Sequence, residues 1–516
     1  MRNEEIQAAW SYHNQTKHSP QSIRNNLHFL DWSNQPIPFK IYSDLEPISL
    51  PQRTTESGIT ALAAISQAEV QRQERRIPDL NDLTRIFYYA AGITKRKRYP
   101  GGEVLFRAAS CTGALYEIEL YLVCEDLPDL AAGVYHFGPS DFALRRLRQG
   151  DFRPVLVHAS AEEPSTAQAP AVIICTGTYW RNAWKYQART YRHFGWDGGT
   201  ILANLLAMCK ALELPARLVL GFMDDEVNRL LDLETDGEVA LFMVPIGRAK
   251  ESPPESHPPV EPLGLRTVPL SKREVDYPEM RRMHDATRLT SPDQVKQWRG
   301  KTRQNQLPPP GGRVFKLEPS RLEERAGASL EEVIQRRGSS RQFERKALRF
   351  EEFSTSLRCS AQGIPSDLLG SPEELLNDWY LIVHAVEGLP SGAYVFHRDS
   401  CSVELLQEGN FRNMAGHLAL GQALAADASF DVFFLADLDS ILESFGNRGY
   451  RAVQLEAGIL GGKLYLAAYA QRRGATGLTF FDDDVTDFFS PHAKEKSTIF
   501  LMALGQGTKR KLVTVE

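Results

Sequence analysis

The chain has 516 residues, of which 42% are hydrophobic and 24% are charged, and its formal net charge is −5. This composition is typical of a globular protein, and the length predicts roughly two to four domains. No apolar run approaches the roughly 20 residues of a membrane span, and no block of basic residues dominates, so neither a membrane nor a nucleic acid is expected as a partner. The polar N-terminus lacks the apolar core of a signal peptide, and we therefore expect a cytoplasmic protein.

Residues 1–50 are predicted to be an N-terminal extension. They contain the segments YHNQTKHS (12–19) and LDWSNQPIPFKIY (30–42). The rest of the sequence contains no second copy of either segment, so the extension stands outside the repeat described below.

Two proline-rich stretches, at 252–262 and 307–312, interrupt the middle of the chain. Proline clusters neither continue a helix nor pair in a central strand. We therefore interpret residues 251–318 as a connector, with one helix near 272–287. The domains predicted on either side of it are 51–250 and 319–516.

The two predicted domains resemble each other in sequence. Tyr380 lies 259 positions after Tyr121, and Arg448 lies 259 positions after Arg189. The matched segments are YLV with YLIV, GVYHF with GAYVF, RTYR with RGYR, and LGFMDDEV with LTFFDDDV. A spacing that four separate segments keep almost unchanged indicates a duplicated domain.

Each copy is predicted to be α+β. Apolar residues recur at three- and four-residue spacing after Gly199 and after Gly458, which predicts a long helix in each copy. Short apolar runs at 171–177, 430–436 and 497–504 predict buried strands. No glycine-rich turn joins a strand to a helix, so a dinucleotide-binding βαβ unit is not supported.

The six cysteines form no CxxC pair, and several lie in apolar segments, such as Cys175 and Cys209. This pattern favours reduced, buried thiols over disulfides or a zinc site. The acidic runs at 224–225 and 482–484 predict helix N-termini. No histidine cluster accompanies them, so we predict no metal site.

The segment RGSSRQF (337–343) places two arginines on either side of two serines. Guanidinium groups and hydroxyls in this arrangement suit a phosphate or an electron-rich ring. A solvated basic turn is an equally good interpretation of the same residues.

A loop of small residues, 108–114, precedes an apolar stretch in RAASCTGALYEIELYLV. Such a loop lets backbone N–H groups approach a ligand closely, and Gly113 helps because it lacks a Cβ. The alternative is a tight turn between two elements, with Cys111 as a packed small residue.

Lys185 and Tyr186 are adjacent in NAWKYQARTYR. A lysine and a tyrosine can donate or accept protons when burial tunes their pKa values. A surface lysine beside a packed ring is the commoner meaning of such a pair.

Together these segments resemble a known family. The R-x-S-x-R-x-F string at 337–343 resembles the flavin-binding signature of the nitroreductase superfamily. GALYEIELYLV, GVYHF, KYQARTYR and the DGG helix look like the SagB/ThcOx branch, which includes azoline oxidases. The two N-terminal segments resemble those of its long, tandem members. The resemblance covers nearly the whole chain outside the connector.

In that superfamily two copies of the fold form a dimer with FMN at the interface. The resemblance implies that here the two domains form an intramolecular pseudo-dimer with one FMN per chain, because the string occurs only in the second copy and the loop only in the first. Residues 50–80 show no string, and the second copy has a shorter segment in place of the loop. The residues implied to bind FMN are Arg337, Ser339, Arg341, Arg107, Ser110, Cys111, Thr112, Gly113, Gly477 and Leu478.

The resemblance also implies roles and shows departures. Lys185 and Tyr186 match a pair that the branch uses catalytically, whereas the second copy has Ser444 and Phe445 at the related positions. The branch typically has proline and serine where this chain has Ser110 and Cys111, and it often has proline in place of the glutamate at 117. These differences concern the detailed contacts of the loop.

The expected function is that of an FMN-dependent oxidoreductase with hydride transfer through flavin N5. One direction is dehydrogenation of a small heterocycle or peptide, with electrons passed to oxygen. The alternatives are a nitro or quinone reductase with NAD(P)H as electron donor, and a non-catalytic flavin-binding scaffold. Because the dimer interface of the family would be internal, we expect a monomer or a weak homo-oligomer.

Overall fold

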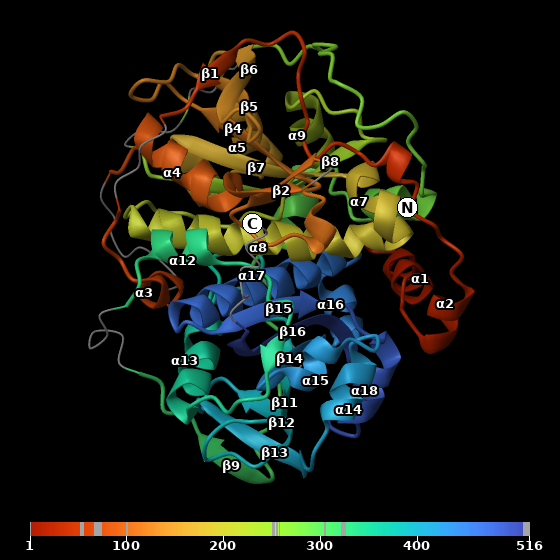
Figure 1. Ribbon diagram of the computed structural model, residues 1–516. Helices are drawn as coiled ribbons and strands as arrows, with labels where there is room; N and C mark the ends of the chain where they lie inside the picture. Colours follow the sequence, from red (N-terminus) through yellow and green to blue (C-terminus); the bar gives the residue numbers. More distant parts are fainter. Residues whose placement is uncertain are drawn as a thin grey trace.

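The computed structural model describes residues 2–51, 56–66, 75–99, 102–249, 253, 256, 258–303, 306–320 and 327–508. Two antiparallel sheets form the upper and lower parts of the molecule in Figure 1, and two long helices lie between them. The structure therefore has the predicted mixture of helices and strands. Across the described residues, every helix is too short or too polar to cross a membrane.

The first sheet has six strands in the order β1-β6-β5-β4-β7-β8. Every neighbouring pair is antiparallel, and β4, β5 and β7 are buried along their whole length. The six strands are β1 (Pro47–Ser49), β4 (Ile118–Cys124), β5 (Gly133–Gly138), β6 (Ala143–Gln149), β7 (Ala171–Thr178) and β8 (Glu238–Ile246). The hairpin of β2 (Ile93–Tyr99) and β3 (Gly102–Arg107) forms a separate two-stranded sheet.

The second sheet has the order β10-β16-β14-β11-β12-β13-β9, and β15 also pairs with β16. Its strands are β9 (Arg313–Lys316), β10 (Phe343–Glu344), β11 (Asp378–Val383), β12 (Gly392–His397), β13 (Ser402–Glu408), β14 (Phe430–Ala436), β15 (Gly474–Leu478) and β16 (Ser497–Gly507). The path β9-β13-β12-β11-β14-β16 matches the strand order of the first sheet. The three strands predicted from apolar runs are confirmed as β7, β14 and β16.

The α-helices cover the sheets and fill the space between them. In the N-terminal part and the connector they are α1 (Gln7–Gln15), α2 (Pro20–Asn25), α3 (Ala61–Ile65), α4 (Leu80–Ala91), α5 (Arg153–Ala159), α6 (Pro164–Gln168), α7 (Tyr179–Tyr186), α8 (Thr190–Ala211), α9 (Asp224–Leu230), α10 (Pro278–Ala286) and α11 (Pro292–Trp298). In the C-terminal part they are α12 (Leu330–Arg336), α13 (Phe350–Ser360), α14 (Arg412–Leu418), α15 (Ala423–Asp427), α16 (Leu438–Phe445), α17 (Arg448–Ala470) and α18 (Asp482–Phe489). The described residues also include the short 3-10 helices η1 (Trp32–Asn34), η2 (Thr112–Ala114) and η3 (Gln187–Arg189).

The helix predicted near 272–287 is confirmed as the shorter α10, whereas α11 was not predicted. Seven residues with a single proline at the start carry too little periodicity to reveal a helix of that length.

Helices α8 and α17 pack directly against each other between the two sheets (Figure 1). A Cβ at Gly199 would lie 2.4 Å from the carbonyl carbon of Gly458, and a Cβ at Gly458 would lie 2.5 Å from the carbonyl oxygen of Gly195. Real Cβ atoms do not approach other atoms so closely. Glycine at these positions therefore brings the two helix backbones into contact, and this contact fixes how the two sheets face each other.

Two buried ion-pair clusters cross the same interface in opposite directions. Asp482, the first residue of α18, pairs with Arg192 at 2.6 Å and with Arg189 at 3.2 Å. Asp224, the first residue of α9, pairs with Arg448 at 2.6 Å and Arg451 at 2.7 Å. The acidic runs thus begin helices, as predicted, and their leading carboxylates also bind arginines of the other half.

The electrostatics of Asp224 show how strongly the cluster is held. Burial opposes ionisation of this carboxyl, but Arg448 and Arg451 outweigh burial and lower its pKa to about 2. Both arginines also donate to the connector, because Arg448 Nη1 donates to the carbonyl oxygen of Thr287 at 3.0 Å and Arg451 Nη1 to the hydroxyl at 3.2 Å. The connector therefore helps to close this cluster.

We predict that Asp224→Asn lowers the free energy of unfolding by about 3–5 kcal/mol at pH 7, because it leaves two buried guanidinium groups without their anion. The folded pKa of Asp224 lies below its unfolded value of about 3.9. Its contribution is therefore present above about pH 4 and lost as the pH falls toward 2. Urea unfolding between pH 7 and pH 2 should show this loss in the unmodified protein and a flatter profile in the variant.

The matched control is Asp225→Asn, which removes the next carboxylate of α9. Asp225 pairs with Arg288 at the surface, so a change of at most about 1 kcal/mol is expected. Equal destabilisation by the two substitutions would show that the buried cluster has no special role.

Candidate functional site

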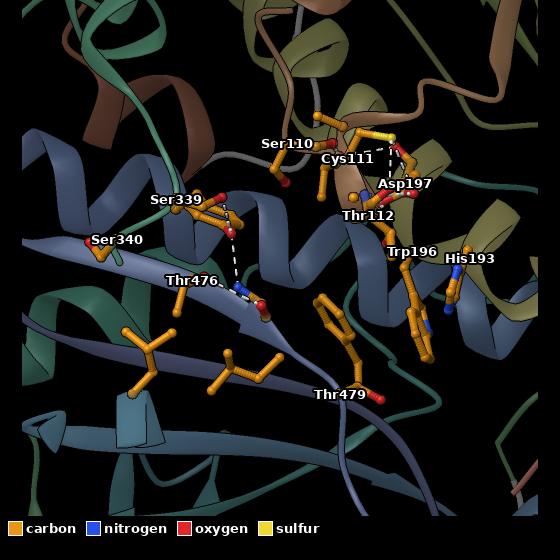
Figure 2. A pocket seen from close by; sticks show the side chains of 18 of the residues that line it. Ser110, Cys111, Thr112, His193, Trp196, Asp197, Ser339, Ser340, Thr476 and Thr479 are labelled. Carbon is orange, nitrogen blue, oxygen red and sulfur yellow. Dashed lines mark hydrogen bonds between the residues drawn. The ribbon is translucent and has the colours of Figure 1, made fainter. Parts of the chain in front are cut away.

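A cavity of about 1480 Å³ lies where the two halves meet. Figure 2 shows Ser110, Cys111, Thr112 and Asp197 on one side of it and Ser339, Ser340 and Thr476 on the other. All of the residues predicted to bind a cofactor or to act in catalysis line this one cavity: Arg107, Ser110, Cys111, Thr112, Gly113, Lys185, Tyr186, Arg337, Ser339, Arg341, Gly477 and Leu478. Arg107 and Leu478, which are 371 positions apart in the sequence, thus line the same cavity.

The small-residue loop is held by Asp197 of α8. The backbone N–H of Thr112 donates to both carboxylate oxygens of Asp197 at 2.9 Å, and the Thr112 hydroxyl donates to Oδ1 at 3.0 Å. Gly113 has φ +66, and a Cβ there would lie 2.9 Å from the Tyr186 hydroxyl. The backbone conformation therefore favours glycine at this position, and a side chain here would press against the Tyr186 hydroxyl.

The arginine string of the second half contacts that loop directly. Arg337 follows α12, and its Nε donates to the carbonyl oxygen of Ala108 at 2.9 Å while Nη2 donates to that of Arg107 at 3.2 Å. Its guanidinium carbon lies 5.5 Å from the centre of the Tyr465 ring. The string and the loop, which come from different halves, form one continuous wall.

Tyr465 of α17 links the string to β15. Its hydroxyl lies 3.0 Å from Ser339 Oγ and accepts a hydrogen bond from the backbone N–H of Gly477 at 2.8 Å. Gly477 and Leu478 are paired with β16 opposite Met502 and Leu501. The predicted segment at 477–478 therefore lies on the cavity wall as part of strand β15.

Lys185 and Tyr186 lie at the end of α7, with the Lys185 ammonium 5.3 Å from the centre of the Tyr186 ring. Desolvation, followed by the positive charge of Arg341, lowers the pKa of Lys185. Burial, followed by the negative charge of Asp197, raises the pKa of Tyr186 well above its usual value, and Arg341 opposes this. A lysine that deprotonates more easily thus stands beside a tyrosine that keeps its proton.

Arg107 differs from the expectation in its side-chain contacts. Its guanidinium donates to the carbonyl oxygen of Pro38 and lies over the rings of Phe39, at 5.4 Å, and Tyr116, at 4.8 Å. Burial lowers its pKa. Arg107 lines the cavity, but its guanidinium binds the N-terminal extension, and its carbonyl accepts the hydrogen bond from Arg337.

Several lining residues were not predicted from the sequence. On α8, the His193 and Trp196 rings lie 4.9 Å apart, and Trp196 lies 5.3 Å from the ring of Phe500. Asp197 anchors the loop. The DGG segment was recognised as part of a helix, but helical periodicity does not show which side chains of a buried helix meet a cavity.

Residues 220–225 of the first half are the repeat counterpart of residues 478–483, which begin at the end of β15. Leu220 of LGFMDD corresponds to Leu478 of LTFFDD. The backbone N–H groups in and just before this stretch donate to residues 365–367 of the second half. The N–H groups of Leu220 and Gly221 donate to Asp367 at 2.8 and 2.9 Å, and Leu218 N–H donates to the carbonyl oxygen of Pro365 at 2.8 Å. The two related walls therefore have different neighbours.

The donor set of the cavity suits a flavin mononucleotide. Arg337 and Arg341 supply positive charge for a phosphate, and the hydroxyl of Ser339 supplies a further donor. The aromatic rings of Trp196, Phe500 and Tyr465 offer surfaces against which a planar ring system can pack.

Comparisons with known proteins indicate a family for part of this chain. Residues 105–248 match the model of the nitroreductase family. A candidate nitroreductase of Methanocaldococcus jannaschii is 27% identical over 172 residues, which cover 33% of this chain and 82% of that protein. The crystal structure of a candidate nitroreductase from Anabaena variabilis matches with a TM-score of 0.77 at 26% identity, over 97% of this chain and 99% of that one.

A candidate nitroreductase from Ralstonia eutropha matches 42% of this chain and all of its own, at 18% identity and a TM-score of 0.32, which is too low to support an argument. The likeness to the Anabaena protein extends along almost the entire chain and includes both sheets. Residues 105–248 are thus a nitroreductase-family domain, and this supports a flavin-dependent oxidoreductase.

Proposed function

We propose that this protein is an FMN-dependent oxidoreductase in which residues 51–250 and 319–516 form an intramolecular pseudo-dimer around one FMN. The observation that carries the proposal is the contact of Arg337 with the carbonyl oxygens of Arg107 and Ala108 inside one large cavity. The string of one half and the loop of the other are then two parts of a single binding site.

The residues present divide the work of holding FMN. Arg337, Arg341 and Ser339 suit the phosphate and the polar edge of the flavin, and the small residues 110–113 let a planar ring approach the loop closely. When bound, FMN supplies hydride acceptance and return at N5. The protein supplies position, charge and proton transfer.

The unequal neighbours of the two related walls support the proposal of one FMN per chain. At Leu220 and Gly221 the backbone donors are already taken by Asp367, and Gly221 also lies close to Trp298. Binding a cofactor there would require displacement of these groups. The wall of β15, in contrast, faces the open cavity.

Lys185 and Tyr186 are the proposed proton-handling residues. The lowered pKa of Lys185 makes the neutral amine more accessible as a base, and the raised pKa of Tyr186 keeps its hydroxyl as a donor. A base is needed when a proton leaves together with a hydride. The pair therefore favours dehydrogenation of a small heterocycle or peptide, with oxygen as the electron acceptor.

The second candidate is a nitro or quinone reductase that takes hydride from NAD(P)H. Lys95 and Lys97 of β2 also line the cavity, and its volume exceeds that of a typical single-ligand site, about 300–1000 Å³. These lysines would suit the phosphates of a nicotinamide dinucleotide bound beside the flavin.

We expect the purified protein to be yellow, and anaerobic bleaching of its flavin separates the two directions. A dehydrogenase should be bleached by an azoline or a similar organic substrate and only slowly by NADPH. Rapid bleaching by NADPH alone would favour the reductase. A colourless protein that takes up no FMN would contradict both enzymatic functions and would favour a non-catalytic scaffold.

Arg337→Ala should weaken FMN retention by roughly 10- to 100-fold, because a charged donor that spans the two halves is lost. Flavin fluorescence of the released fraction after gel filtration measures the retention. Arg345→Ala is the control, since Arg345 pairs with Asp427 at the surface, 2.6 Å away. If both variants keep FMN equally, Arg337 is not part of the site.

Lys185→Ala should retain FMN but slow flavin reduction by the organic substrate by roughly 100-fold, since general acid–base catalysis contributes on this scale. Stopped-flow absorbance under anaerobic conditions gives the rate. Lys296→Ala, a surface substitution near Glu162, should leave it unchanged. Normal reduction in the Lys185 variant would remove this residue from the proposed chemistry.

A further inference from the structure

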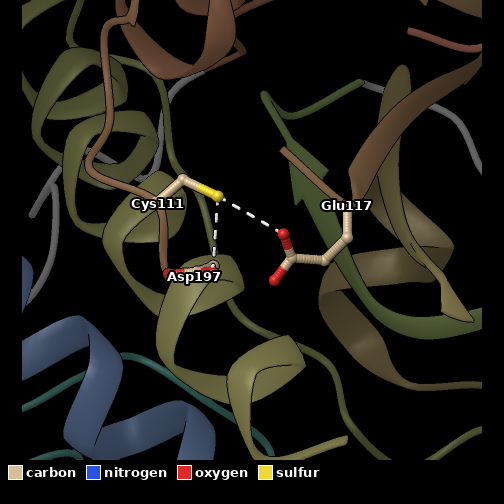
Figure 3. A group of neighbouring side chains, drawn as sticks. All are labelled: Cys111, Glu117 and Asp197. Atoms are coloured by element: carbon tan, nitrogen blue, oxygen red, sulfur yellow. Dashed lines mark hydrogen bonds between the residues drawn. The ribbon is translucent and has the colours of Figure 1, made fainter. Parts of the chain in front are cut away.

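Cys111, Glu117 and Asp197 converge beneath the loop that borders the cavity (Figure 3). Cys111 Sγ lies 3.3 Å from Glu117 Oε2 and 3.4 Å from Asp197 Oδ2. The three residues come from the loop, from the position before β4 and from α8, so the fold alone brings them together.

Three acidic groups in one buried place present an electrostatic problem. Glu117 is 0% and Asp197 is 4% exposed. Several anions cannot remain uncompensated in such surroundings, so the cluster holds either protons or a cation.

We propose that Cys111, Glu117 and Asp197 bind one divalent transition-metal ion, zinc by the preference of its ligands. Thiolate and carboxylate are ligands that zinc accepts, and three protein ligands with one open position are common for this ion. Zinc–sulfur and zinc–oxygen distances of about 2.3 and 2.1 Å at a tetrahedral angle place S and O about 3.6 Å apart. The observed separations of 3.3 and 3.4 Å need only a small adjustment.

The surroundings of the cluster supply what a metal site needs. The N–H of Tyr116 donates to Cys111 Sγ at 3.0 Å, which stabilises a thiolate, and Thr112 donates to Asp197 and orients it. Among the described residues, Glu117 Oε1 is buried and has no hydrogen-bond partner. The oxygen is therefore available as a second ligand atom.

Space and access are also present. A small cavity of about 10 Å³ adjoins the cluster, and its lining combines Cys111 and Asp197 with Arg107, Ser110, Tyr116 and apolar side chains. This volume is close to that of a single bound water or ion. Cys111 and Asp197 also line the large cavity, so an ion can enter from there and a fourth ligand can be water.

Such an ion would tie the loop to α8 and to the start of β4. It would replace the protons that the metal-free cluster must hold, so its binding should release protons and strengthen as the pH rises. Residues 110–113 would then be fixed independently of any ligand in the cavity.

Titration of the chelator-dialysed full chain with Co²⁺ tests the proposal. Visible d–d bands, at wavelengths where the flavin does not absorb, should saturate at one ion per chain and disappear on addition of Zn²⁺. Cys111→Ser should lose these bands, whereas Cys401→Ser, which changes a half-buried thiol of the second half, should keep them. Glu117→Gln should weaken Co²⁺ binding at least tenfold. This second variant keeps the proposal testable if Cys111→Ser does not fold.

Bands that are absent, or that persist at the same strength in Cys111→Ser and Glu117→Gln, would overturn the proposal and leave a proton-sharing cluster. The readout is independent of flavin turnover. If no metal binds, the proposed oxidoreductase function is therefore unaffected. If the protein binds no flavin, the Co²⁺ titration can still be carried out.

Discussion

The buried exchange of charge between the two halves is the constraint on which the rest of the structure depends. Asp482 of the second half pairs with Arg189 and Arg192, and Asp224 of the first half pairs with Arg448 and Arg451. Separating the halves would leave arginines on both sides without an anion, which is strongly unfavourable for buried charges. Together with the glycine contact between α8 and α17, this exchange fixes the walls of the cavity relative to each other.

The two clusters are closed by different parts of the chain, and this breaks the symmetry of the repeat. Arg192 donates to the carbonyl oxygen of His13 at 2.7 Å and to the hydroxyl of Thr16 at 3.0 Å, so the N-terminal extension covers one cluster. The connector covers the other through Thr287. The cavity opens beside the extension, whereas residues 365–367 fill the related place near the connector.

Part of this organisation could be predicted from the sequence. The sequence alone predicted the repeat and the strands at 171–177, 430–436 and 497–504, because these depend on local patterns of residues. It also predicted that the string and the loop share one site, because both match a known motif. The start of a helix at each acidic run could be predicted for the same reason, since it depends on a local pattern of residues.

The sequence did not show which residues contact each other across the fold, although it showed many of the helices and strands. A run such as DDE indicates a helix N-terminus, but it does not show that Asp224 pairs with Arg448, 224 positions away. Asp197, Tyr465 and the engagement of Arg107 with Pro38 were missed for the same reason. Periodicity shows that a residue is buried, and only the packed fold shows against what.

A crystal structure of the FMN-loaded chain tests the central claim most directly. The account predicts one FMN, in contact with residues 110–113 of the first half and with residues 337–341 of the second. An FMN that contacts only one half, or a second FMN between Gly221 and residues 365–367, would contradict it.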